Sequence, residues 1–301
     1  MTSPELTTFR LTFDAMGSSC EVMLAAVNEA EARRLAQFAI DEVKRIEHKY
    51  SRYTQDGVTA QINRAAGGDW IQVDEETLSL LSYADSLYEA SGGLFDMTSG
   101  VLRRAWNFKQ PALPSETVLN EALSLIGWHR VERDGEALRL PDVGMEVDFG
   151  GFGKEYAADR AAEVLMGEGV QHGYVNLAGD MRIIGPKPDG QPWQIGIQDP
   201  RVPGRVVATI PVESGALATS GDYERFFELD GKRYCHILDP KRGFPVGYWR
   251  SISVLAPVAI VAGSCTTIAM LKEQAGIEFL ESTGMDYLAI DHGGENYQKT
   301  F

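Results

Sequence analysis

The strongest constraint on the fold comes from the second half of the chain, where short apolar segments alternate with turn residues. This pattern is typical of antiparallel strands joined by tight connections. We expect hairpin turns at residues 188–190 (Pro-Asp-Gly) and 230–231 (Asp-Gly), because proline, aspartate and glycine favour the backbone conformations of tight turns. Strands are predicted over residues 144–149, 173–177, 181–185, 193–198, 206–212, 225–229, 232–237, 252–255 and 287–290.

Helical periodicity dominates the first half. Apolar residues recur at helical spacing over residues 29–50, and Asn28 is a suitable N-cap. Two strands, over residues 9–13 and 20–24, precede this helix. Further helices are predicted over residues 75–90, 116–126, 154–166, 260–271 and 277–282. The sequence therefore predicts an α+β protein with a mostly antiparallel sheet core and flanking helices. Because we find no repeat and no linker, we expect a single intertwined domain over residues 1–301.

Charge and composition exclude several classes of function. The 301 residues include 43 acidic and 28 basic side chains, which gives a formal net charge of −15 and argues against a nucleic-acid partner. No segment reaches the roughly 18 uncharged apolar residues of a spanning helix, and the N-terminus lacks the apolar core of a secretory signal. We therefore expect a cytoplasmic protein without a membrane anchor. Three separated cysteines without a CxxC pair predict neither a disulfide framework nor a zinc site.

One segment joins a predicted strand end, a glycine-rich turn and a helix start. Asp148 ends the strand, glycines follow at positions 150, 151 and 153, and Lys154 begins the helix. Glycines let a backbone approach a ligand closely, and the first N–H groups of a helix attract anions. The spacing matches neither the dinucleotide fingerprint nor the P-loop. A tight structural turn and a ligand site both remain open.

Two further segments could carry chemistry. His236 precedes an Asp-Pro pair where a predicted strand gives way to a turn, so its imidazole can point into a cleft or cap the turn by a hydrogen bond. The other histidines are isolated and predict no histidine metal site. In residues 91–100, small side chains surround Phe95 and Asp96. That run could wrap an aromatic ring or simply connect two helices.

Together and in this order, these motifs resemble the ApbE family, the FAD:protein FMN transferases. The resemblance extends from about residue 12 to residue 293. The motifs that carry it are Met16-Gly17, Ser51-Arg52-Tyr53, Ser91-Gly92-Gly93-x-Phe95-Asp96-x-Thr98, Asp148-x-Gly150-Gly151 with the helix at Lys154, Val175-Asn176-Leu177-x-Gly179-Asp180, Ala218-Thr219-Ser220-Gly221-Asp222-Tyr223 and His236-Ile237-x-Asp239-Pro240.

The resemblance implies a T-fold-like protein that binds FAD and Mg²⁺, cleaves the pyrophosphate and leaves FMN on a threonine of a partner flavoprotein, with release of AMP. It implies His236 as the general base, or as the group that orients the acceptor threonine, and Asp148 as a second catalytic residue. Metal ligands would be the carbonyl of Gly151 and a cluster around Thr266 and Thr267. Contacts to the flavin and adenosine would fall on Met16, Tyr53, Leu94, Phe95, Asp96, Asp148, Lys154, His236 and Ile237.

Within that resemblance, Tyr53 and Phe95 would pack on rings, and Lys154 would face a phosphate. The chain also departs from the family pattern, because Gly263 stands where typical members carry an aspartate that binds the metal. A smaller departure is Val101, where the family usually has proline.

The glycine at 263 leaves two outcomes open. Another carboxylate could substitute for the missing aspartate, with Asp180, Asp222 and Asp239 as candidates. Alternatively the protein could bind FAD without transferring FMN, as a flavin carrier. A separate possibility, which does not depend on position 263, is hydrolysis of FAD to FMN and AMP by water. Residues 56–60 lack the ending of an acceptor motif, so we expect the acceptor to be another protein.

Overall fold

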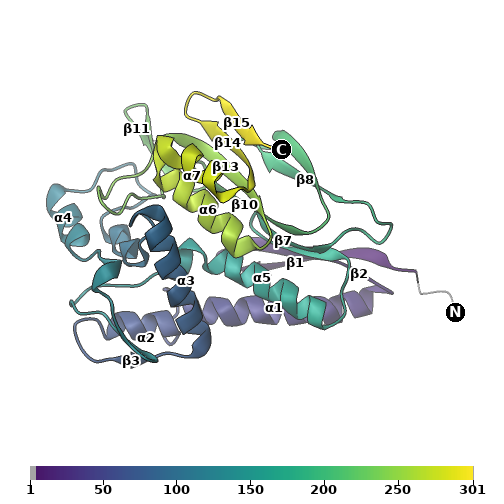
Figure 1. The fold of residues 1–301 in the computed structure, drawn as a ribbon, viewed down its shortest axis with the longest axis horizontal. Coiled ribbons are helices and arrows are strands. Elements are labelled where there is room, and N and C mark those ends of the chain that lie inside the picture. The colour runs from purple at the N-terminus through teal and green to yellow at the C-terminus, as the bar shows by residue number, and fades with distance from the viewer. Residues whose placement is uncertain (1–4, 301) are drawn as a thin grey trace.

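The computed structural model describes residues 5–300, and its centre is an eight-stranded sheet in which every neighbouring pair is antiparallel (Figure 1). This confirms the α+β prediction. No helix of this part of the chain has both the length and the apolar character needed to cross a bilayer. In spatial order the strands are β1 (Thr7–Ala15), β2 (Ser18–Ala26), β6 (Gly173–Leu177), β7 (Asp180–Gly185), β10 (Gly215–Gly221), β13 (Trp249–Ala256), β14 (Asp286–Asp291) and β15 (Asn296–Lys299).

Three smaller sheets complete the strands. They pair β8 (Trp193–Gln198) with β9 (Val206–Val212), β11 (Phe226–Leu229) with β12 (Lys232–Cys235), and β3 (Ile71–Gln72) and β4 (Glu132–Asp134) with β5 (Ala137–Arg139).

Of the two predicted hairpin turns, one is confirmed and one is wrong. Asp230 and Gly231 join β11 to β12 with φ angles of 51° and 74°, as a two-residue hairpin turn requires. Residues 188–190 also form a turn, but they connect β7 to β8, and each of these strands pairs with other strands.

Two of the long helices begin at side-chain N-caps, and Asn28 is the one predicted above. Asn28 accepts a hydrogen bond from the N–H of Glu31 at 2.9 Å, and Asp74 accepts one from the N–H of Thr77 at 3.0 Å. The helices are α1 (Glu29–Tyr50), α2 (Val58–Arg64), α3 (Glu75–Ser91), α4 (Glu116–Ser124), α5 (Gly153–Gly167), α6 (Ala259–Leu271) and α7 (Gly276–Thr283), with short 3-10 segments η1 (Met97–Arg104), η2 (Trp128–Arg130), η3 (Phe149–Gly151) and η4 (Glu273–Ala275).

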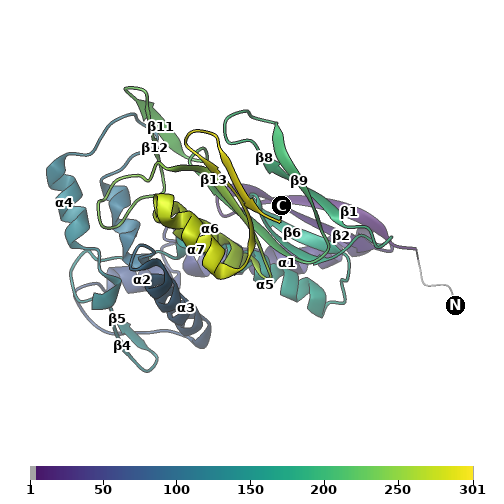
Figure 2. The same ribbon diagram turned by 45° about the horizontal axis from the view of Figure 1, so that its top comes forward.

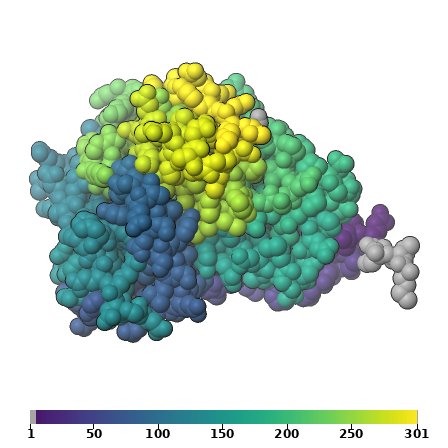
Figure 3. Space-filling model, viewed as in Figure 1, coloured from purple at the N-terminus to yellow at the C-terminus, as the bar shows by residue number. Residues whose placement is uncertain are grey.

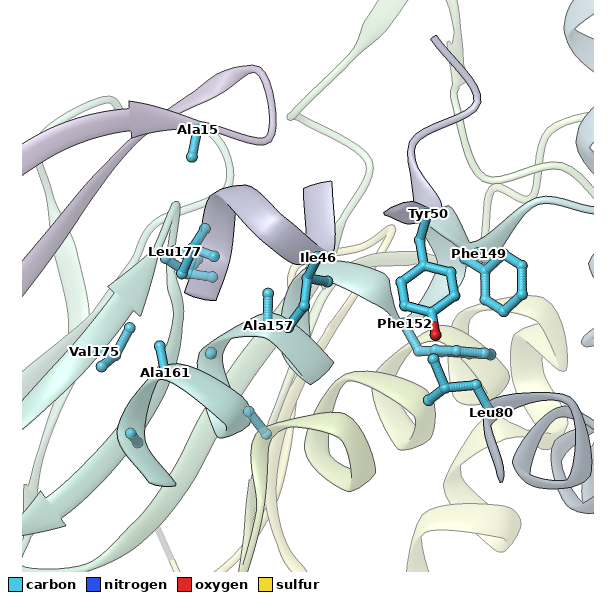
Figure 4. Packing of buried hydrophobic residues seen from close by; sticks show 14 of the residues in the cluster. Ala15, Ile46, Tyr50, Leu80, Phe149, Phe152, Ala157, Ala161, Val175 and Leu177 are labelled. Carbon is cyan, nitrogen blue, oxygen red and sulfur yellow. The ribbon is translucent and has the colours of Figure 1, made fainter. Parts of the chain in front are cut away.

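The main core lies where α1 and α5 pack against each other and against the sheet. Figure 4 shows Ala157 of α5 beside Ile46 of α1, with the rings of Tyr50, Phe149 and Phe152 gathered nearby. The centroids of the Tyr50 and Phe149 rings are 4.7 Å apart. Alanines on the buried face of α5 permit this close packing, and the aromatic cluster fixes where α5 begins.

The elements between α1 and α5, which include α2, α3 and α4, lie together at one end of the molecule (Figure 2). In Figure 3 their blue surface lies against the yellow-green surface of the C-terminal elements. The contact includes Tyr83 of α3, whose hydroxyl donates to the carbonyl of Ile260 at 3.2 Å and to Oγ of Ser264 at 3.0 Å. Helix α3 therefore packs on α6, and α6 also contacts α5, where the space beside Gly263 is filled by Glu155.

Two predictions of local structure fail for identifiable reasons. Residues 144–149 were predicted as a strand, but the backbone of Val147 is hydrogen-bonded by the side-chain amide of Asn63, at 2.7 and 3.0 Å, and not by a neighbouring strand. Strand β10 was not predicted, because its sequence Gly-Ala-Leu-Ala-Thr-Ser-Gly has weak strand propensity. Its small side chains let α6 pack closely on the middle of the sheet.

Candidate active site

The turn before α5 is held by Asp148. Its Oδ1 accepts a hydrogen bond from the N–H of Gly150 at 2.9 Å, and its Oδ2 forms an ion pair with the guanidinium of Arg52. A Cβ on Gly100 would lie 2.7 Å from the Cβ of Asp148, so this approach depends on a glycine at position 100. The tight turn expected from the sequence is therefore present, and it aims the first turn of α5 at α6.

Lys154, on that first turn, is engaged by Asp180. Its Nζ lies 2.5 Å from Oδ2 of Asp180, which is 3% exposed and also accepts from the N–H of Thr219 at 3.3 Å. Burial works against the charged form of Lys154, but the carboxylates of Asp180 and Glu155 outweigh it and raise the pKa of the lysine. Lys154 therefore stays protonated, and a phosphate would have to share it with Asp180.

The next residue, Glu155, is buried against α6. It is 8% exposed, and its Oε2 has no hydrogen-bond partner among the described residues. Burial, and then the negative charge of Asp180, raise the pKa of Glu155 above its ordinary range. Its side chain fills the space beside Gly263, where an added Cβ would lie 2.5 Å from Oε1.

Hydroxyl groups gather on the same turn of α6. The hydroxyl of Thr266 donates to the carbonyl of Gly263 at 2.8 Å. The Oγ of Ser220, on β10, lies 2.9 Å from Oγ1 of Thr266 and 3.4 Å from Oγ1 of Thr267. The structure thus places Ser220 of β10 beside both threonines that were predicted as metal ligands. Gly151 lies at the end of η3, which contacts α6, and a Cβ there would meet the ring of Phe95 at 2.8 Å.

His236 follows β12 and is partly buried. Its backbone N–H donates to the carbonyl of Arg225 at 3.0 Å, but its Nδ1 is enclosed without a partner in residues 5–300. Burial, with the positive charges of Arg225 and Lys154, lowers the pKa of His236 to about 4. The imidazole is therefore neutral at neutral pH, the form in which a histidine accepts a proton.

The turn after His236 is capped by another residue. Oδ1 of Asp239 accepts from the N–H groups of Lys241, at 2.7 Å, and Arg242, at 3.2 Å. The alternative in which His236 caps this turn is therefore not what the structure shows.

Two of the residues predicted to contact FAD have local roles. Phe95 is 6% exposed and stacks on Phe152 with ring centroids 6.1 Å apart. The carboxylate of Asp96 accepts from the N–H of Thr98 at 2.7 Å and from the N–H of Trp128 at 3.0 Å. Residues 91–100 thus connect α3 to η1. A direct contact of either side chain with FAD remains a prediction.

The other predicted contacts are more accessible. Tyr53 is 77% exposed and lies under the guanidinium of Arg52, with 5.1 Å from Cζ to the ring centroid. Met16 occupies the β1–β2 turn at a φ of 56°, and its N–H donates to Oε1 of Glu47 at 2.6 Å. Leu94 and Ile237 are partly buried against one hydrophobic cluster beneath α6. The ring of Tyr53 is thus open to solvent, and its contact with FAD remains a prediction.

Sequence reasoning missed Glu155. A signal was present, because Glu155, Ala158 and Ala162 share one helical face, and a charged residue among buried alanines is unusual. The carboxylates proposed as substitutes for an aspartate at 263 are all committed to cations. Asp180 pairs with Lys154, Asp222 with Arg201 at 2.7 Å and Asp239 with Arg242 at 2.5 Å.

The side chains and carbonyl groups near α6 determine which metal ion could bind there. Within residues 5–300 no group of three or more His, Cys, Asp or Glu side chains is arranged to hold an ion. One carboxylate with several hydroxyl and carbonyl oxygens does suit a hard cation such as Mg²⁺, which keeps several waters. Two surface hollows lie elsewhere, one beside the N-terminus of α1 and one beside the loop after α7, and neither includes these donors.

Comparison with known proteins identifies the family. A model of the ApbE family matches residues 16–289. The chain belongs to the ApbE family. Its curated relatives include the FAD:protein FMN transferases of Vibrio cholerae, 30% identical over 273 residues that cover 87% of this chain and 81% of the relative, and of Treponema pallidum, 30% identical with coverages of 88% and 82%.

Solved structures of the ApbE family agree with the fold. The ApbE protein of Thermotoga maritima superposes with a TM-score of 0.89 at 33% identity and covers 98% of this chain and 97% of its own. The flavin transferase ApbE of Vibrio cholerae gives a TM-score of 0.88 at 26% identity, with 98% of each chain covered.

Proposed function

We propose that this chain transfers FMN from FAD to a threonine hydroxyl of a partner flavoprotein, releases AMP and depends on Mg²⁺. Membership of the ApbE family supports the reaction class. The observation that carries the assignment to this site is the enclosed Nδ1 of His236, which has no hydrogen-bond partner in residues 5–300; the charge of Lys154 contributes to lowering the pKa of this imidazole.

The reaction needs a base and a charge-stabilised pyrophosphate. The acceptor hydroxyl oxygen forms a bond to the phosphorus of the FMN half, the bond from that phosphorus to the bridging oxygen breaks, and AMP leaves with that oxygen. His236 takes the hydroxyl proton, since its imidazole is neutral at neutral pH. Lys154 offers positive charge to the phosphates while Asp180 fixes its position.

Magnesium fits the oxygen-rich donors on α6. The hydroxyls of Thr266 and Thr267 and the carbonyl of Gly151 are hard oxygen donors on elements that contact one another. When bound, Mg²⁺ would neutralise pyrophosphate charge and stabilise the leaving AMP. Arg52 and Asp148 would position the turn that leads to Lys154.

Intact-mass analysis tests this proposal. A threonine-bearing acceptor domain is incubated with FAD and the protein, with Mg²⁺ or with EDTA. The proposal predicts a mass gain of one FMN only with Mg²⁺. The variant His236→Gln should abolish the gain, whereas the exposed-histidine control His129→Gln should keep it. FAD bound without any gain, across several acceptors, would instead establish a flavin carrier.

A further inference from the structure

Glu155 is an exception among the buried acids of the protein. Seven other carboxylates are buried in residues 5–300, and each accepts a hydrogen bond. Six of them accept from a backbone N–H group: Asp96, Asp159, Asp180, Asp199, Asp239 and Asp291. The seventh, Asp222, accepts from the guanidinium of Arg201. Oε2 of Glu155 has no partner in that part of the chain. Because a buried polar atom without a hydrogen-bond partner is destabilising, the structure calls for a group that this oxygen binds.

The nearest basic side chain does not fulfil that role. Lys154 points its Nζ at Asp180, 2.5 Å away, so the pair is neutral as a whole. Arg182 is bound elsewhere, since it lies 3.2 Å from Asp159 and donates to the carbonyl of Gly215 at 2.9 Å. An ionised Glu155 therefore leaves one negative charge uncompensated between α5 and α6, and a buried charge of this kind is stable only with a cation.

The groups around Glu155 favour a metal cation. Its carboxylate meets α6 at Gly263, whose carbonyl accepts from the hydroxyl of Thr266 at 2.8 Å. The hydroxyls of Ser220 and Thr267 join the same network. Carboxylate, hydroxyl and carbonyl oxygens are the ligands of hard divalent cations, whereas an organic cation would need an apolar or aromatic lining.

We infer that Glu155 is the carboxylate ligand of a divalent cation held between α5 and α6, with the hydroxyls of Thr266 and Thr267 beside it. The inference rests on the proposed function and specifies its metal site. It also accounts for Gly263, because the carboxylate reaches the space beside that residue from α5. A carboxylate at position 263 would need the same space. A Gly263→Asp variant should therefore bind the cation only when the side chain of Glu155 is also shortened.

Binding of Mn²⁺ alone tests the inference without any turnover. Free Mn²⁺ is titrated by electron paramagnetic resonance against the full chain, with and without FAD. We expect Glu155→Gln, which keeps the shape and removes the charge, to weaken Mn²⁺ binding at least 10-fold. Glu163→Gln is the matched control, since Glu163 lies on the same helix and is half-exposed. It should bind Mn²⁺ as the wild type does.

A charge swap keeps the test decisive if Glu155→Gln fails to fold. The double variant Glu155→Gly with Gly263→Asp moves the carboxylate from α5 to α6, and we expect it to bind Mn²⁺ within about 10-fold of the wild type, a difference of about 1.4 kcal/mol. Glu155→Gly alone should not bind.

The outcomes separate the inference from the proposed function. Equal Mn²⁺ binding by the wild type and Glu155→Gln, or no binding by the wild type with or without FAD, overturns the inference, and FMN transfer by the wild type would then still support the function. Loss of binding in Glu155→Gln, with recovery in the swap, supports the inference even if the wild type transfers no FMN to any acceptor.

Discussion

Gly263→Ala measures how tightly Glu155 fills the space beside α6. Gly263 lies inside a helix, where alanine ordinarily stabilises by about 1 kcal/mol. Here the new Cβ would lie 2.5 Å from Oε1, 2.6 Å from Cγ and 2.7 Å from Cδ of Glu155. Because Glu155 is buried, it has no free solvent to move into, and overpacking costs about 1–3 kcal/mol. We expect a net destabilisation of about 1 kcal/mol.

The sign should reverse once Glu155 is truncated. In a Glu155→Ala background the same Gly263→Ala change meets no carboxyl group, so the helix preference remains and stabilises by about 1 kcal/mol. The double-mutant cycle then gives a coupling of about 2 kcal/mol, read from urea unfolding at one temperature. If Gly263→Ala stabilises both backgrounds equally, Glu155 does not occupy this space and the reasoning is refuted.

Three further predictions follow from other contacts. Asp159→Ala removes the carboxylate that accepts from the N–H groups of Ala259 and Ile260, both at 2.8 Å, and should destabilise by about 2 kcal/mol in urea unfolding, whereas Glu163→Ala should change stability by less than about 0.5 kcal/mol. The rate of FMN transfer should fall as the pH drops through about 4, because the reaction needs the neutral form of His236 and the pKa of this histidine is about 4. A loss of activity already near pH 6.5 would contradict the burial of the ring. The free energy of unfolding should decline as the pH falls from about 6.5 toward 4. His236 has a pKa near 6.5 in the unfolded chain and about 4 in the folded protein, so the unfolded state takes up a proton more readily in this range. The variant His236→Gln should remove this part of the pH dependence.

Local signals predicted most of the secondary structure. The long helix α1 has the predicted bounds, since its N-cap and its periodicity agree. Strand β10 could not be found in this way, because its small residues are selected by the helix that packs on them and not by strand propensity. Residues 144–149 have the pattern of a strand, but a side chain of α2 takes the place of the neighbouring strand.

Only part of the candidate site could be predicted from the sequence. The resemblance pointed to His236 and Thr266. The structure encloses Nδ1 of His236 without a partner in residues 5–300, and it places Oγ1 of Thr266 2.9 Å from Oγ of Ser220. Glu155 was missed, because its importance depends on α5 facing α6, a contact between segments about 100 residues apart in the chain. The sequence also gave no sign that Asp96 is already occupied by backbone N–H groups.

The central claim is that the hydroxyl of a protein threonine, and not water, receives the FMN. The most direct test is the ratio of AMP released to acceptor flavinylated, measured in one reaction with Mg²⁺ and limiting FAD. Transfer predicts equal amounts of the two products and no AMP when the acceptor threonine is replaced by valine. AMP in excess of flavinylated acceptor, or AMP release that does not depend on the threonine, would contradict the claim and establish hydrolysis of FAD.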